Sequence, residues 1–429
     1  MSRLHVPAIL LLYYSPLGAN AATVSEHVGS FARHSRFPVF SVNTELGFPR
    51  GLARLDFRVV VLHYSVFGRY PYLLNSAFCR YIAESRASYR IAFFQDEYQY
   101  CTARFRFLDD MRIDCIYSLL EPSEVSRVYL EHTRVRKVLH TLTGFVSDDL
   151  VETAARWSLP DEQRGIDVGY RGRQLPFFMG RGAQEKTVIA QEFVRRTAGR
   201  PLVLDIKTGE ADRIYGDDWW RFIANCRGML GVEAGVSVFD IEDQVRPRCA
   251  QILAERPGAS FEEVAAVALR DWEDNIYYRT ISPRVFEAAA FRVCQILFEG
   301  RYNGLLEPMT HYLPLKKDFS NLDQVLSDFA DPATRQRIAD RAHADLIASG
   351  EYSYRRFIEQ FDADLRQAGI EPVADAAALR QARAFLDQGS RLRALRARIQ
   401  TRLHRPFPGK ALVKAALSPL LKRRSQAAD

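Results

Sequence analysis

The sequence predicts an α/β protein of two lobes, each a parallel sheet with crossover helices, that face each other across a cleft. At 429 residues the chain is too long for one hydrophobic core, and ordinary domain sizes favour about two or three units. Short apolar and β-branched runs alternate with stretches of helical periodicity, which is typical of parallel sheets with crossover helices. We expect C-terminal helices and a basic tail to follow the lobes.

The first lobe is expected to span residues 1–164. The apolar run before Tyr14 also resembles the core of a signal peptide, but a Gly-containing loop and a helical segment follow it, which favours a buried first strand. The expected elements are, in order, strand 8–13, helix 22–34, strands 39–42 and 59–63, a helix around 75–84, and strands 90–95, 115–118 and 137–139.

A boundary is expected near residues 157–164, where polarity rises and Pro160 and Gly165 interrupt the periodic pattern. The second lobe is expected to span 165–345, and terminal helices 346–389. Its elements are expected to be strand 167–170, helix 184–197, strand 201–206, helix 217–229, strand 232–239, a turn and helix over 281–290, strand 294–298 and helix 322–327, with further helices from 332 to about 388.

The tail, residues 390–429, carries most of the positive charge. It holds eleven Lys or Arg and one acidic residue, a net charge of +10, whereas the whole chain has +7 and the remainder therefore −3. A body near neutrality argues against nucleic-acid binding by the whole surface. Within 391–424 apolar residues recur at helical spacing with basic residues on the opposite faces, which favours a helix lying on an anionic membrane surface. A terminal helix packed on the body and a solvated end are the alternatives.

The cysteines and histidines offer no metal site. No Cys-x-x-Cys pair, no Asp-x-Asp at a strand end and no His pair with ligand spacing occurs, so we expect neither a metal nor another cofactor. Scattered cysteines fit a reducing compartment, and we expect a cytoplasmic protein, on the inner face of the membrane if the tail binds there. They are Cys79, Cys101, Cys115, Cys226, Cys249 and Cys294.

One segment is specific enough to indicate a family. The run Ser282-Pro283-Arg284-Val285-Phe286-Glu287-Ala288-Ala289-Ala290 resembles the donor-binding segment of group 1 glycosyltransferases of GT-B fold, and especially of the spore-maturation-type (CgeB-like) branch. The resemblance implies two Rossmann-like lobes, with Glu287 opening a helix and accepting hydrogen bonds from the ribose of a nucleotide sugar. Ser282 is expected to cap that helix or contact phosphate, and Arg284 belongs to the same donor segment. The resemblance covers residues 165–360 and rests over the first lobe on architecture alone.

A departure from the family pattern concerns a second glutamate. Retaining enzymes of this kind carry two glutamates eight positions apart, and eight positions before Glu287 stands Arg279. The second carboxylate is therefore missing or supplied from elsewhere, with Glu233 and Glu273 as candidates. The departure leaves open whether configuration at the anomeric carbon is retained or inverted.

The donor's diphosphate needs positive charge, because the leaving group becomes more negative as the anomeric bond breaks. Basic residues before an expected helix resemble those that such enzymes place on it, and a guanidinium binds phosphate in bidentate fashion. A solvated basic loop is the alternative. Residues 231–237 form a Gly-containing turn whose amides suit a phosphate, or only a tight turn. The candidates are Arg171, Arg173, Arg181, Lys186, Gly235 and Ser237.

Candidates for the acceptor side follow strands of the first lobe, where side chains line the crevice of such sheets. If the enzyme inverts configuration, a general base must reach the cleft from this lobe, and His63, Asp96 and Glu97 are the candidates. His63 equally suits a structural hydrogen bond. Gly18 and Asn20 belong to the loop after the first strand, where we expect the acceptor to approach.

The resemblance implies a metal-independent enzyme that transfers a sugar from a nucleotide diphosphate to a hydroxyl of a glycan or lipid-linked acceptor, in envelope or surface polysaccharide synthesis. A sugar-nucleotide epimerase would need the same donor cleft and no acceptor. A catalytically degenerate, membrane-associated scaffold is the third possibility, and the arginine at position 279 is its main support.

Overall fold

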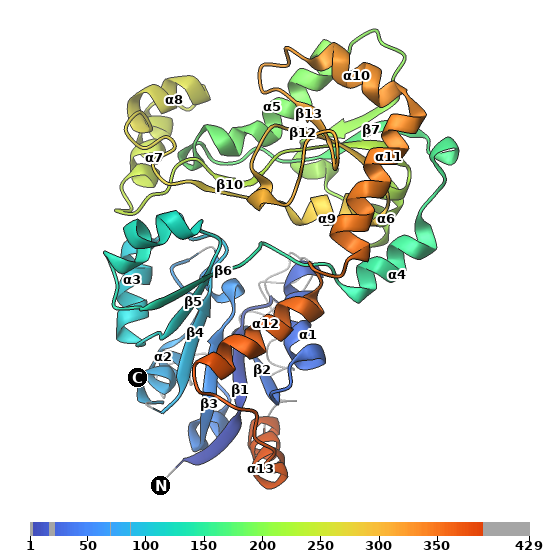
Figure 1. Ribbon diagram of the computed structural model, residues 1–429. Coiled ribbons are helices and arrows are strands. Elements are labelled where there is room, and N and C mark those ends of the chain that lie inside the picture. Colours follow the sequence, from blue (N-terminus) through green and yellow to red (C-terminus); the bar gives the residue numbers. More distant parts are fainter. Residues whose placement is uncertain (1–2, 17–21, 69, 86, 389–429) are drawn as a thin grey trace, which may run out of the picture.

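The computed structural model describes residues 3–16, 22–68, 70–85 and 87–388. Two lobes, each built around a parallel sheet, lie one above the other in Figure 1. The strand order is β2-β1-β3-β4-β5-β6 in the first sheet and β13-β12-β9-β7-β8 in the second. The predicted α/β fold of two doubly wound lobes is thereby confirmed.

The N-terminal apolar run forms an interior strand of the first sheet, between β2 and β3. Ile9 and Leu11 face α1 and a C-terminal helix, whereas Leu10 and Leu12 face the opposite core. Burial on both faces explains why the strand reads as a continuous apolar run. The first lobe contains β1 (Leu4–Tyr13), β2 (Val39–Asn43), β3 (Leu55–Leu62), β4 (Tyr89–Phe93), β5 (Cys115–Ser118), β6 (Lys137–His140), α1 (Ala22–His34), α2 (Ser76–Glu84) and α3 (Cys101–Asp110).

The second lobe differs from its prediction at residues 217–239. The expected helix ends at Ala224, and the residues after it form β9 in the middle of the sheet, between β12 and β7. Only β10 remains of the next expected strand, and it pairs antiparallel with β11. The lobe contains β7 (Ile166–Arg171), α5 (Arg181–Arg196), β8 (Leu204–Lys207), α6 (Asp217–Ala224), β9 (Cys226–Gly231), β10 (Ala234–Val236), β11 (Tyr278–Thr280), α9 (Pro283–Ala290), β12 (Cys294–Phe298), β13 (Leu313–Leu315), α10 (Leu322–Ala330) and α11 (Pro332–His343).

Two helices inserted between β10 and β11 reach back toward the first lobe. They are α7 (Val245–Glu255) and α8 (Phe261–Ala268), which share a small core of their own. Figure 1 shows them above α3 of the first lobe. Just before α7, the carboxylate of Asp243 accepts hydrogen bonds from the backbone N–H groups of Cys101 and Thr102, at 2.9 and 3.0 Å. The insertion therefore joins the lobes opposite the chain crossover.

The chain crosses between the lobes twice. After β6 it passes to the second lobe, where α4 (Asp148–Trp157) packs on α6 and α9, so the crossing comes before the expected boundary at 157–164. It returns at Ser353, and α12 (Tyr354–Gln367) packs on α1 while α13 (Ala376–Asp387) packs beside β1. No helix in the described part of the chain has the length and apolar character needed to cross a membrane. The tail 390–429 lies outside the described residues, and its membrane contact stays a prediction.

Candidate functional site

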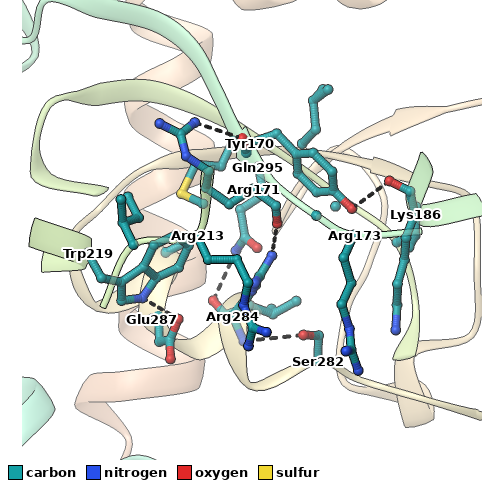
Figure 2. Close-up of a pocket in the computed structure, with 18 of the residues that line it drawn as sticks. Tyr170, Arg171, Arg173, Lys186, Arg213, Trp219, Ser282, Arg284, Glu287 and Gln295 are labelled. Carbon is teal, nitrogen blue, oxygen red and sulfur yellow. Dashed lines mark hydrogen bonds between the residues drawn. The ribbon is translucent and has the colours of Figure 1, made fainter. Parts of the chain in front are cut away.

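A cavity of about 470 Å³ opens at the carboxyl edge of the second sheet, where ligands bind in doubly wound folds. Its walls are the segments that follow β7 and β9 and the first turns of α6 and α9, with Thr23 of α1 contributing from the first lobe. Figure 2 shows the cavity and the charged side chains around it. Its lining includes six of the predicted site residues: Arg171, Arg173, Lys186, Ser282, Arg284 and Glu287.

Helix α9 brings Glu287 into the cavity. The helix begins after Ser282, whose hydroxyl accepts a hydrogen bond from the N–H of Arg284, and Pro283 suits its first turn. One carboxylate oxygen of Glu287 accepts a hydrogen bond from the indole N–H of Trp219 at 3.0 Å. Among the described residues, its other oxygen has no hydrogen-bond partner, so it is free for a hydroxyl of a ligand. Burial raises the pKa of this carboxyl above its ordinary value, and Arg284 opposes the rise.

Arg173 and Lys186 form the cationic wall of the cavity. Figure 2 shows their side chains running side by side, and neither makes an ion pair or a side-chain hydrogen bond within the described residues. Burial, reinforced by the neighbouring charges of Arg284 and Arg173, lowers the pKa of Lys186 to about 8, and Asp96 of the first lobe opposes this shift. Two adjacent cations without a carboxylate partner are what a diphosphate needs in order to bind.

Arg171 plays a different part from the predicted one. Its guanidinium forms an ion pair with Asp205 at 2.8 Å and lies over the ring of Phe222, 4.2 Å from its centroid. The positive charge of Arg171 is therefore already paired within the second lobe and stabilises the fold there. The backbone carbonyl of Arg171 faces the cavity and accepts a hydrogen bond from Arg284, whose guanidinium lies over the indole of Trp219. Arg171 therefore positions Arg284 and does not offer its own charge to a phosphate.

The remaining predicted donor residues lie outside the cavity. Arg181 is exposed and makes a bidentate ion pair with Glu262, with N–O distances of 2.6 and 2.9 Å. Gly235 has φ +95° in β10, where a side chain would meet the carbonyl oxygen of Tyr278. Ser237 is buried and accepts a hydrogen bond from an N–H at the start of α5. All three stabilise the second lobe, and the prediction that they bind the donor is corrected accordingly.

Two of the first-lobe candidates are buried away from the cavity. His63 is fully buried and shares a hydrogen bond of 3.0 Å with His27, and burial holds the pKa of both rings below the ordinary value. The carboxylate of Glu97 accepts hydrogen bonds from the backbone N–H of Leu119 and from the hydroxyls of Ser118, Tyr129 and Tyr278. Because their polar atoms are engaged inside the core, neither residue can serve as the predicted general base.

Asp96, the third candidate, is exposed on the cleft side of the first lobe. Its carboxylate makes no hydrogen bond or ion pair among the described residues. Desolvation of the carboxyl by the protein atoms around it raises its pKa, while the charges of Arg104, Lys186 and Arg173 lower it. Two of those cations, Lys186 and Arg173, belong to the second lobe, so the charge of Asp96 interacts with the cationic wall across the cleft. Gly18 and Asn20, the predicted acceptor loop, lie outside the described residues.

Several cavity residues escaped the sequence analysis. They lie on α6, on the loop before it and on β12. The sequence predicts their position at the carboxyl edge of the second sheet only when the ends of α6 and β9 are assigned correctly. The adjacent pair Trp219-Trp220 at an expected helix start was the available signal. The residues are Arg213, Tyr215, Trp219, Trp220 and Gln295. No cluster of metal-ligating side chains was found among the described residues.

Comparisons with known proteins give similarities in structure alone. No family model and no curated protein matches the sequence. Anabaena Alr3699/HepE in complex with UDP has a TM-score of 0.47 at 10% identity, covering 84% of this chain and 100% of that one. An alpha-glucosyltransferase in complex with UDP and a 13-mer DNA has 0.46 at 8%, covering 85% and 100%. TarM has 0.37 at 10%, covering 73% of this chain and 55% of its own. At TM-scores below 0.5 such similarities assign neither a family nor a substrate.

Proposed function

We propose that the chain is a glycosyltransferase that binds a nucleotide-diphosphate sugar in the cavity of the second lobe and transfers the sugar to an acceptor hydroxyl. One observation carries the proposal. A cavity of about 470 Å³ holds Arg173 and Lys186, two cations without an ion-pair partner among the described residues, and the carboxylate of Glu287, of which only one oxygen has a hydrogen-bond partner there. The carboxylate suits the ribose hydroxyls and the cations suit the diphosphate, so the cavity matches the nucleotide end of the donor at both points.

The same residues account for the chemical step. When the anomeric bond breaks, its electron pair leaves with the nucleoside diphosphate, and negative charge grows on the leaving oxygen. With the diphosphate bound beside Arg173 and Lys186, as proposed, these cations stabilise the charge that develops in the transition state more than the charge of the bound donor. We propose a metal-independent transfer, in which these two side chains supply the positive charge.

The finer assignments are proposals as well. The segment Ser282–Glu287 lies at the cavity, which supports placing the chain with the CgeB-like group 1 enzymes. All six cysteines are free, which fits the cytoplasm. We propose a glycan or lipid-linked acceptor of the cell envelope, approached through the basic tail on an anionic membrane. Co-sedimentation with anionic liposomes, compared with a truncation ending at Gly389, tests the tail; equal pelleting of both proteins refutes it.

Thermal unfolding with nucleoside diphosphates tests the donor site. A ligand present at about 100 times its Kd stabilises the folded state by about 2.7 kcal/mol, so UDP, GDP or ADP is expected to raise Tm. Glu287→Ala is expected to reduce the rise to about half or less, whereas Glu152→Ala, at an exposed position on α4, is expected to keep it in full. If none of the three nucleotides changes Tm, the proposed function is wrong.

Labelled donor distinguishes transfer from the alternatives. Transferred or hydrolysed sugar supports the glycosyltransferase. Free isomerised sugar nucleotide with no transfer would establish an epimerase instead, and unchanged donor in the presence of tight nucleotide binding would establish a non-catalytic scaffold.

A further inference from the structure

The last strand of the second sheet, β8, has an open edge. It pairs with β7 on one side, and no strand among the described residues pairs with its other side. The backbone carbonyls of Val203 and Lys207 accept hydrogen bonds from the β7 side. Backbone groups of successive residues point to alternate sides of a strand, so those of Leu204 and Ile206 point outward. Such a row of outward groups can pair with a further strand.

Apolar side chains lie beside this open edge. A groove of about 320 Å³ lies between β8 and α5, and Ala190, Val194 and Ile206 are among the residues that line it. Val194 is 43% exposed and Val203 57%, although aliphatic side chains of this kind are usually buried. An apolar patch next to an unpaired strand edge indicates an interaction surface.

The charges along β8 favour a second copy of the same strand as the partner. Two copies related by a twofold axis pair as antiparallel strands, and residues directly opposite each other lie on the same face of the sheet. With Ile206 opposite Ile206 of the second copy, Asp205 lies opposite Lys207 of that copy, and this ion pair occurs twice. The two adjacent registers that keep the faces aligned are centred on Asp205 or on Lys207 and place like charges opposite each other, which is destabilising. The charges therefore select the register centred on Ile206.

Both charged side chains are accessible to such a partner. The side chain of Asp205 is 30% exposed although it pairs with Arg171, and that of Lys207 is 51% exposed. Lys207 lies 3.6 Å from the carboxylate of Asp212, which is itself exposed. Exposed ion pairs of this kind contribute little, so Lys207 can turn to a carboxylate of the second copy at small cost.

We propose that two copies of this chain associate through β8, antiparallel about Ile206, and join their second sheets into one continuous sheet. The two α5 helices then lie on the same face of the joined sheet, where Val194 of each copy is covered by the other. The interface borders residues 208–216, the loop after β8, in which Arg213 and Tyr215 line the donor cavity. The dimer therefore holds one wall of the proposed donor site in place.

Analytical ultracentrifugation of the full chain without nucleotide tests the dimer. The wild type is expected to sediment as a dimer that dissociates on dilution. Lys207→Glu places like charges opposite Asp205 at two symmetric positions and is expected to raise the Kd of the dimer about tenfold or more. Lys316→Glu makes the same change of charge at an exposed position outside the interface and is the control. A wild type that is monomeric at every concentration, or an unchanged dimer in Lys207→Glu, overturns the proposal.

A cysteine at position 206 tests the register. In the pair centred on Ile206 the two Cα atoms are expected about 5.5 Å apart, a separation that a disulfide spans. Ile206→Cys, treated with oxidised glutathione, is expected to form a covalent dimer linked through position 206, which peptide mass spectrometry identifies. Leu204→Cys faces Thr208 of the second copy and is expected to stay without a crosslink, as is the wild type. A crosslink in Leu204→Cys and none in Ile206→Cys would overturn the register.

Nucleotide binding tests the effect on the donor loop, and this part rests on the proposed function. Val194 does not line the donor cavity, so Val194→Glu is expected to give a monomer that binds nucleoside diphosphate about fivefold or more weakly than the wild-type dimer. Val151→Glu, at an exposed position on α4, is the control. Unchanged affinity in a monomeric Val194→Glu would refute the effect on the loop. Absence of nucleotide binding by the wild type is the failure of the proposed function, whereas the sedimentation experiment decides the dimer by itself.

Discussion

The protonation of Lys186 makes a quantitative prediction about donor binding. Burial and like charges lower the pKa of this ammonium to about 8, and a diphosphate binds the protonated form. The protonated fraction is therefore about 90% at pH 7 and about 10% at pH 9. If the neutral amine contributes nothing, the affinity for a nucleotide sugar falls about tenfold between these pH values. The direction is fixed, because raising the pH through the pKa removes the positive charge that the phosphates contact.

Lys186→Met isolates this effect. Losing a charge-assisted hydrogen bond costs about 1.5–3 kcal/mol, so we expect the variant to bind about 10- to 150-fold more weakly at pH 7. Its affinity is also expected to be nearly independent of pH between 7 and 9, apart from changes in the nucleotide base. Subtracting the variant's pH dependence from the wild type's removes the contribution of the base.

Isothermal titration calorimetry at pH 7, 8 and 9 provides the affinities. Lys316→Met, at an exposed position outside the cavity, is the control and is expected to follow the wild type. Because the buried ammonium is held beside Arg173 and Arg284, the methionine variant is also expected to unfold at a higher temperature than the wild type without ligand. Weak binding in a more stable protein excludes misfolding as the cause. Equal pH dependence in Lys186→Met and the wild type would refute the role of Lys186.

Three further predictions concern single residues. Glu287→Ala is expected to weaken UDP binding about 10-fold or more while leaving pyrophosphate binding unchanged, because only the ribose contact is lost; equal loss for both ligands would contradict this. In the wild type, UDP affinity is expected to fall as the pH drops through the raised pKa of Glu287. Arg181→Ala is expected to leave UDP affinity within about twofold, since exposed ion pairs contribute little, and calorimetry tests this. Asp243→Ala is expected to lower the free energy of unfolding in urea by about 1 kcal/mol through loss of the α3 cap, with Asp271→Ala as control.

The order of elements could be predicted from the sequence wherever a strand and a helix differ clearly in periodicity. Residues 217–239 are the exception. The short run Cys226–Gly231 suits either structure, and its pairing with β7 and β12 decides for a strand. Gly228 permits this, because a side chain there would meet the ring of Phe329 and the backbone of Asp167. Such contacts between distant segments are invisible in a single sequence.

Site residues could be predicted from the sequence where their position follows from the local structure of their own segment, such as the start of a helix. Glu287 and Ser282 belong to one helix start, and the structure places both at the cavity. The basic cluster could not be resolved in the same way, because charge alone does not show which cation is paired. Arg181 forms an ion pair with Glu262, which lies 81 positions away in the sequence, and Arg171 forms one with Asp205, 34 positions away. The cations left without partners in the described structure, Arg173 and Lys186, are then the ones available to a ligand.

The neighbouring acids Asp96 and Glu97 show how the fold connects the two walls of the cleft. Strand β4 has just ended, and the two side chains point to different environments: Asp96 is exposed toward the cationic wall, whereas Glu97 is buried. The hydroxyl of Tyr278, from the second lobe, donates to the carboxylate of Glu97 at 3.2 Å and to the carbonyl of Gln95 at 2.5 Å. The same hydrophobic core includes Phe94 of the first lobe and Phe239 and Tyr278 of the second.

Opening the cleft would therefore expose this shared core and leave the buried carboxylate of Glu97 with fewer hydrogen bonds, and both changes are costly. These contacts of Tyr278 and the shared core form a joint between the lobes. The joint lies on the side opposite the two chain crossings, so the lobes are held together on both sides of the cavity. Asp96, one residue from the joint, is thereby fixed relative to Lys186, which explains how the two charges influence each other across the lobes. Lobes held in this way keep the charged side chains on the two sides of the cleft in fixed positions, as a preorganised site requires.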